Sequence, residues 1–167
     1  LPDSKTTEAI REIERFWTLK DVYARYGLLH KRGILFYGPP GSGKTATIQQ
    51  MVDLVVKQYS GIALYVDGPM LAAAVLQLIR KIEPDRPIIA IMEELDSLVR
   101  SHQGGPTHYL SLLDGEAQVS NIVFVATTNF IEDLDDRFKN RPSRFDKRIF
   151  IDMPSPEARR AYLKHRI

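Results

Sequence analysis

Five short apolar runs, separated by stretches with helical spacing, constrain the fold of this 167-residue chain more than any other feature. Each run is rich in β-branched or aromatic residues: GILFY (33–37), IALYV (62–66), PIIAIM (87–92), NIVFVA (121–126) and RIFIDM (148–153). Helical patterns lie at residues 44–58, 69–82, 107–114 and 156–165. Strands that alternate with helices form parallel sheets, and near-continuous apolar strands are buried on both faces. The pattern predicts an α/β fold with a five-stranded parallel sheet sandwiched by helices and ligands at the carboxyl ends of the strands.

The loop after the first run has the full pattern of a phosphate-binding loop. Between a predicted strand and a predicted helix, the chain reads Gly38-Pro39-Pro40-Gly41-Ser42-Gly43-Lys44-Thr45, a match to G-x-x-x-x-G-K-T. Glycines let the backbone turn its N–H groups toward an anion, and the helix that begins near Gly43 directs its positive dipole end to the same place. We expect Lys44 to reach the terminal phosphates, Thr45 to bind Mg²⁺, and the loop through Ala46 to hold a nucleoside triphosphate. The alternative is a glycine-rich turn without function, and the complete motif in its required context argues against it.

Acidic residues follow the third apolar run, at Glu93, Glu94 and Asp96. Carboxylates at the end of a buried strand are costly to desolvate unless a cation lies near them. A Mg²⁺-nucleotide bound beyond the first strand supplies that cation, so we expect Glu93 to hold the metal and Glu94 to act as the base that polarises water. Asp96 suits the positive end of a following helix. A solvated acidic helix start explains the same residues, but it does not account for the phosphate loop upstream.

Composition excludes several other classes. Lys and Arg number 23 against 21 Asp and Glu, so the net charge of +2 does not indicate a nucleic-acid partner. The chain has no cysteine, which excludes disulfides and thiolate metal sites and favours a cytoplasmic location. No apolar run approaches the ~20 residues of a membrane-spanning helix.

Several motifs together resemble one family. The segments GILFYGPPGSGKT, PIIAIMEELDSL, YLSLLDGE, FVATTN and RPSRFDKRIFIDMP occur in the order found in AAA-family (AAA+) ATPases, and the resemblance covers about residues 10–160. The chain is most similar to the subgroup of the mitochondrial Rieske-protein translocase and related bacterial and phage ATPases. Members of this subgroup also have a glutamate at the position of Glu93, where most of the family has aspartate. The resemblance implies a P-loop NTPase fold, ATP and Mg²⁺ as ligands, and ATP hydrolysis.

Further site residues follow from this resemblance. Asn129 matches the polar sensor that contacts the γ-phosphate or orients the water, on a fourth strand that lies between the first and third strands in the sheet. Arg141 and Arg144 match two arginines that family members insert into the nucleotide site of a neighbouring subunit, because a permanent, forked cation suits phosphate oxygens. This match implies that the active form is a homo-oligomeric ring, a hexamer or a similar assembly, with sites between subunits.

The domain organisation is also implied by the family. Residues 1–26 form an N-terminal helical segment, within which Ile10, Ile13, Phe16 and Trp17 have helical spacing. Residues 27–153 form the nucleotide-binding large subdomain, and residues 154–167 begin a helical lid that is largely missing. The expected function is ATP-driven remodelling or translocation of a macromolecular partner, most simply an unidentified protein. The alternative is an ATPase of the loader or initiator type that handles nucleic acid.

Overall fold

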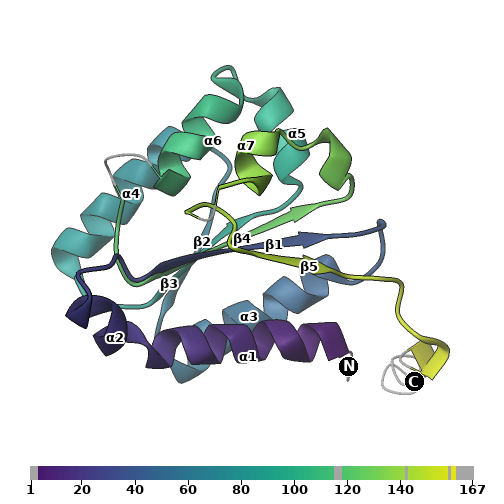
Figure 1. Cartoon of the computed structure of the whole chain (residues 1–167), viewed down its shortest axis with the longest axis horizontal. Helices are drawn as coiled ribbons and strands as arrows, with labels where there is room; N and C mark the ends of the chain where they lie inside the picture. Colours follow the sequence, from purple (N-terminus) through teal and green to yellow (C-terminus); the bar gives the residue numbers. More distant parts are fainter. Residues whose placement is uncertain (1–3, 115–117, 142, 158, 161–167) are drawn as a thin grey trace.

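The computed structural model describes residues 4–114, 118–141, 143–157 and 159–160. Its centre is a single sheet of five parallel strands in the order β2-β3-β4-β1-β5 (Figure 1). The strands are β1 (Lys31–Tyr37), β2 (Ile62–Tyr65), β3 (Ile88–Met92), β4 (Ile122–Thr128) and β5 (Lys147–Phe150). The predicted α/β fold is confirmed, and β4 lies between β1 and β3 as expected.

Helices cover both faces of the sheet in Figure 1. On one face lie α1 (Ser4–Thr18), α2 (Lys20–Arg25) and α3 (Lys44–Gln58); on the other lie α4 (Pro69–Ile82), α5 (Leu95–Ser101), α6 (Gly105–Asp114) and the short α7 (Asp136–Lys139). A 3₁₀ turn, η1 (Ile131–Asp133), follows β4. Alternate residues of β4 point to opposite faces, so Val123 and Val125 pack with α1 and α3, whereas Phe124 and Ala126 pack with α4 and α6.

Burial explains why these segments form these elements. All five residues of β3 and all seven of β4 are buried, as expected of central strands in a parallel sheet. The predicted helices at 44–58 and 69–82 agree with α3 and α4, and α6 begins two residues before the predicted start at 107. The predicted helix at 156–165 lies mostly outside the described residues. No helix in the described ranges combines the length and the apolar character that crossing a membrane requires.

The N-terminal segment forms two helices, and its apolar stripe covers the sheet. Ile13, Phe16 and Trp17 are buried in the cluster between α1, α3 and the sheet. The ring of His30 stacks on Phe16 with centroids 3.9 Å apart. Its Nε2 lies 2.9 Å from the Phe16 carbonyl oxygen, and its Nδ1 lies 3.0 Å from Asn121 Oδ1. This histidine therefore joins α1 to the start of β4.

Gly33 in β1 lies under the chain that leads into β5. A methyl group at this position would lie 1.6 Å from the carbonyl oxygen of Arg144. The Gly33 N–H also donates to Asp146 Oδ1 at 2.9 Å. The close approach of the two backbones therefore requires a residue without a side chain.

We expect Gly33→Ala to lower the free energy of unfolding by about 2–3 kcal/mol, because backbone atoms must move to admit the methyl group. For a chain of this size the loss corresponds to a fall in Tm of about 5–10 °C in thermal unfolding followed by circular dichroism. Gly68→Ala is the control, since no atom lies within 4 Å of the added methyl group. Equal Tm values for the two variants would contradict this account of Gly33.

Candidate nucleotide site

The phosphate-binding loop joins the end of β1 to the start of α3. Gly41 and Gly43 have φ angles of 77° and 99°, in the left-handed region that favours glycine. Gly43 is the N-cap of α3, and its carbonyl oxygen accepts the first helical bond from Thr47 N–H. The residues between Gly43 and Thr47 have N–H groups with no partner within the helix, and these groups point along its axis. The loop thus presents a backbone site for an anion.

Lys44 is the buried cation of this site, with 8% of its surface exposed. Its ammonium group donates to the carbonyl oxygens of Gly38 and Pro39 at 2.7 and 2.9 Å. Burial lowers the pKa of Lys44, while the negative charge of Glu94 acts in the opposite direction. Within the described part of the chain, no carboxylate forms an ion pair with it. A buried cation held only by neutral groups fits a loop whose negative charge comes from a ligand.

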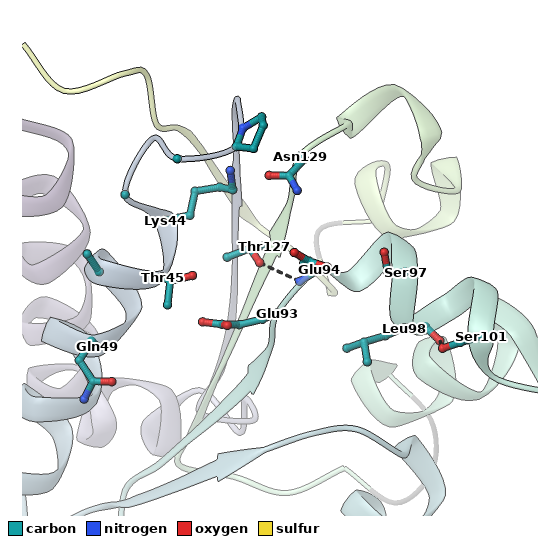
Figure 2. A pocket seen from close by; sticks show the side chains of 14 residues that line it. Lys44, Thr45, Gln49, Glu93, Glu94, Ser97, Leu98, Ser101, Thr127 and Asn129 are labelled. Atoms are coloured by element: carbon teal, nitrogen blue, oxygen red, sulfur yellow. Dashed lines mark hydrogen bonds between the residues drawn. The ribbon is translucent and has the colours of Figure 1, made fainter.

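The acidic residues and Asn129 lie across a shared pocket from the loop. The pocket has a volume of about 970 Å³ and is lined by Lys44 and Thr45 from α3, by Glu93 and Glu94 after β3, and by Asn129 after β4. Figure 2 shows Glu93 extending toward Thr45, with Glu94 beside Thr127. The structure therefore brings together the predicted loop, the two glutamates and Asn129. Because β1, β4 and β3 are neighbours, their carboxyl ends meet at this edge.

The oxygen atoms present suit Mg²⁺ bound with a nucleotide. Among the described residues no group of three or more His, Asp or Glu side chains is placed to hold a metal ion by itself. Mg²⁺ does not require such a group, because it keeps several waters and is bound by one or two protein oxygens plus phosphates. The hydroxyl of Thr45 and the carboxylate of Glu93 are the side chains that fit this role.

Asp96 lies in the first turn of α5, as the sequence suggested, but its surroundings were not predicted. It is 6% exposed, and its carboxylate accepts hydrogen bonds from Thr128 Oγ1 at 2.9 Å and from Arg100 at 2.7 Å. Asp96 is therefore tied to the end of β4 as well as placed at a helix N-terminus.

The two predicted arginines differ in their surroundings. Arg144 is 6% exposed; its Nε lies 2.7 Å from Asp114 Oδ2, and it also donates to the carbonyl oxygen of Arg137. Arg141 has a side chain that is 67% exposed, with one nitrogen 3.8 Å from the same carboxylate. Neither arginine is among the described residues that line the pocket. In this conformation, Arg141 extends into solvent and Arg144 is held inside its own chain.

Several pocket residues were missed by the sequence interpretation. These are Gln49 on α3, Thr127 on β4, and Ser97, Leu98 and Ser101 on α5. On α5, Ser101 lies four residues after Ser97 and three after Leu98, the spacings that bring side chains together on one side of a helix. That spacing is a signal in the sequence, but it is also typical of an ordinary surface helix.

Comparison with known proteins agrees with this geometry. Residues 34–153 match the model of the family described as ATPase family associated with various cellular activities (AAA). A protein of Bifidobacterium dentium named AAA ATPase forming ring-shaped complexes is 29% identical over 87% of this chain and 32% of its own length. The proteasome-associated ATPase of Frankia alni is 30% identical over 92% of the chain and 30% of its own length. The ATP-dependent zinc metalloprotease FtsH of Marinobacter nauticus is 31% identical over 93% of the chain and 27% of its own length. The chain thus spans about a third or less of the length of these relatives.

Lys44→Ala is expected to weaken the binding of Mg²⁺-ATP at least tenfold in isothermal titration. The variant loses the only charged donor of the loop, and hydrogen bonds to charged groups contribute about 1.5–3 kcal/mol. Lys57→Ala is the matched control, because it removes the same charge at the far end of the same helix, where the side chain is 71% exposed. Undiminished affinity in Lys44→Ala would contradict the assignment of the loop.

Proposed function

This chain belongs to the AAA family of ATPases, and on that premise we propose that it hydrolyses ATP as one subunit of a ring and thereby remodels or moves a protein partner. The observation that carries the proposal is the shared pocket, in which Lys44, lacking a carboxylate ion pair within the described residues, faces Glu93, Glu94 and Asn129. A site that only binds a nucleotide needs no more than the phosphate-binding loop. Carboxylates and an amide opposite the phosphates provide, in addition, the groups that activate water.

Each residue has a task that its position supports. The N–H groups at the start of α3 and the ammonium of Lys44 bind the β- and γ-phosphates, in place of the carbonyl oxygens that Lys44 now contacts. Thr45 and Glu93 hold Mg²⁺ directly or through water. When bound there, the metal would supply positive charge that offsets the negative charge of the phosphates during hydrolysis.

Glu94 acts as the base and Asn129 as the orienting group. The water that attacks the γ-phosphorus loses its proton toward the Glu94 carboxylate while the bond to the ADP oxygen breaks. Asn129 follows β4 directly, so its amide faces the same region and donates to the water or to the γ-phosphate. The sequence and the pocket support Glu94 in this role because Glu93 extends toward Thr45 (Figure 2).

Arg141 is the residue we assign to the neighbouring subunit's site. Its side chain is exposed, whereas Arg144 is buried against Asp114. We therefore refine the predicted pair: Arg141 extends to the neighbour, and Arg144 fixes the segment that carries it. A relative is described as forming ring-shaped complexes, which supports an oligomer of this kind.

A protein is the partner that we favour. Two relatives are named as a proteasome-associated ATPase and an ATP-dependent metalloprotease, which supports action on proteins. The net charge of +2 offers no support for nucleic acid. A cytoplasmic location is part of the proposal and rests on the sequence expectation alone.

Glu94→Gln in the full-length protein is expected to bind ATP with near-normal affinity and to hydrolyse it at least 100-fold more slowly. The amide keeps the shape of the side chain but cannot accept a proton from water, and general-base catalysis contributes about 10²–10⁴-fold. Isothermal titration and a phosphate-release assay measure the two quantities.

Glu93→Gln is the matched control for this experiment, because it makes the same change one residue away. It should raise the Mg²⁺ concentration needed for half-maximal turnover. The two assignments are reversed if Glu93→Gln loses only turnover while Glu94→Gln behaves as the wild type.

Arg141→Ala in the full-length protein is expected to bind ATP and turn over at least tenfold more slowly, since an arginine supplied by a neighbour stabilises transition-state charge. Mixing it with Lys44→Ala should restore part of the activity, because some interfaces then pair an intact loop with an intact arginine. Arg25→Ala, an exposed arginine at the end of α2, is the control and should retain full activity.

The mixing experiment is read only where co-assembly of the two variants is demonstrated by native mass spectrometry. Absence of rescue at every mixing ratio would then count against sites shared between subunits.

A further inference from the structure

Two consecutive threonines end β4, and both hydroxyls form hydrogen bonds with the turn between β3 and α5, which contains Glu94 and leads to Asp96. Thr127 and Thr128 are buried, with 3% and 0% of their surfaces exposed. Adjacent residues of a strand point to opposite faces, so the two side chains lie on different sides of the sheet. Thr127 lines the pocket, and the hydroxyl of Thr128 faces Asp96 in the first turn of α5.

Thr127 holds the backbone of Glu94. The Glu94 N–H donates to Thr127 Oγ1 at 2.9 Å, the interaction drawn as a dashed line in Figure 2. Glu94 has φ 49° and ψ 53°, a left-handed conformation that is unfavourable for a residue other than glycine. Such a conformation persists only where the surroundings hold it.

Thr128 holds the same turn from the other side, through Asp96. Its hydroxyl donates to Asp96 Oδ1 at 2.9 Å, and Arg100 of the same helix donates to Oδ2. Arg100 neutralises the buried carboxylate but lies on the same helix. Of the hydrogen bonds described for Asp96, only the one from Thr128 therefore links α5 to the sheet.

We propose that Thr127, Thr128 and Asp96 are positioning residues for ATP hydrolysis. Together they fix the left-handed turn that points Glu94 into the pocket and fix it relative to Asn129, the next residue after Thr128. The inference rests on the proposed role of Glu94 as the base. Small displacements of a base are costly, because a misplacement of about 1 Å lowers a rate by about 10²-fold.

The test compares valine, which keeps the shape of threonine without the hydroxyl, with serine, which keeps the hydroxyl. In the full-length protein, Thr127→Val and Thr128→Val should bind Mg²⁺-ATP within about threefold of the wild type while kcat falls by about 10- to 100-fold. Thr127→Ser and Thr128→Ser should keep kcat within about threefold.

Tyr109→Phe is the control for a structural effect alone. Tyr109 is fully buried away from the pocket, and its hydroxyl donates to the Asp67 carbonyl oxygen at 2.8 Å. Like Thr127→Val, this variant loses one buried hydrogen bond, so its fall in Tm should be comparable to that of Thr127→Val while its kcat stays unchanged. Thr128→Val also loses the bond from Phe130 N–H at 3.2 Å, so a larger fall in Tm is expected for it. If Thr128→Val does not fold, Thr127→Val decides the question. This variant is expected to fold, because water in the pocket can bond to the Glu94 N–H that loses its partner.

Three outcomes overturn the proposal: valine variants with normal kcat, serine variants as slow as the valine variants, or an equal loss of kcat in Tyr109→Phe. Glu94→Gln measured alongside separates the two levels of inference. A slow Glu94→Gln with normal valine variants rejects the positioning role alone. A Glu94→Gln with wild-type turnover rejects the role of Glu94 and the positioning role together.

Discussion

The pairing of β4 between β1 and β3 is the interaction on which the site depends. Ala126 lies opposite Leu35 on one side and Met92 on the other, so the three strands end at nearly the same level. The phosphate loop, the two glutamates and Asn129 each follow one of these ends. Because side chains alternate along a strand, a slip of one residue would exchange the faces of Thr127 and Thr128. The register therefore determines which hydroxyl reaches Glu94 and which reaches Asp96.

Most of the buried charges in the described part of the chain have an ion-pair partner within it, whereas the one in the phosphate loop has only neutral partners. Asp96 is paired with Arg100, and Arg144 is paired with Asp114. Lys44 is also buried, but in the described structure it has only carbonyl oxygens and the hydroxyl of Ser42 as partners. Desolvation of a cation is costly when no anion compensates it. The phosphates of a nucleotide would supply that compensation. Nucleotide binding would therefore offset the desolvation free energy of the Lys44 ammonium group.

Local patterns in the sequence were sufficient for much of this arrangement. The bounds of α3 and α4 could be predicted because a glycine precedes each and apolar spacing runs through them. The phosphate loop could be predicted because its residues are contiguous. The burial of Arg144 could not, since its partner Asp114 lies 30 residues away and only the fold brings them together. The bonds from Thr127 and Thr128 to the turn after β3 also depend on strand order, which the family resemblance implied and the residues alone did not.

The separation of Arg141 from its own pocket has a consequence for assembly. The chain presents two different surfaces, one with the phosphate loop and the glutamates and one with an exposed arginine. An isologous dimer pairs the same patch on both subunits, so it can join these surfaces only if both lie within that patch. A heterologous contact joins unlike surfaces, and it leaves one of each free until the arrangement closes into a ring. In the proposed ring every subunit then gives an arginine to one neighbour and receives one from the other. In this proposal, the ion pair between Arg144 and Asp114 holds the segment next to Arg141, whose exposed side chain would reach across the interface.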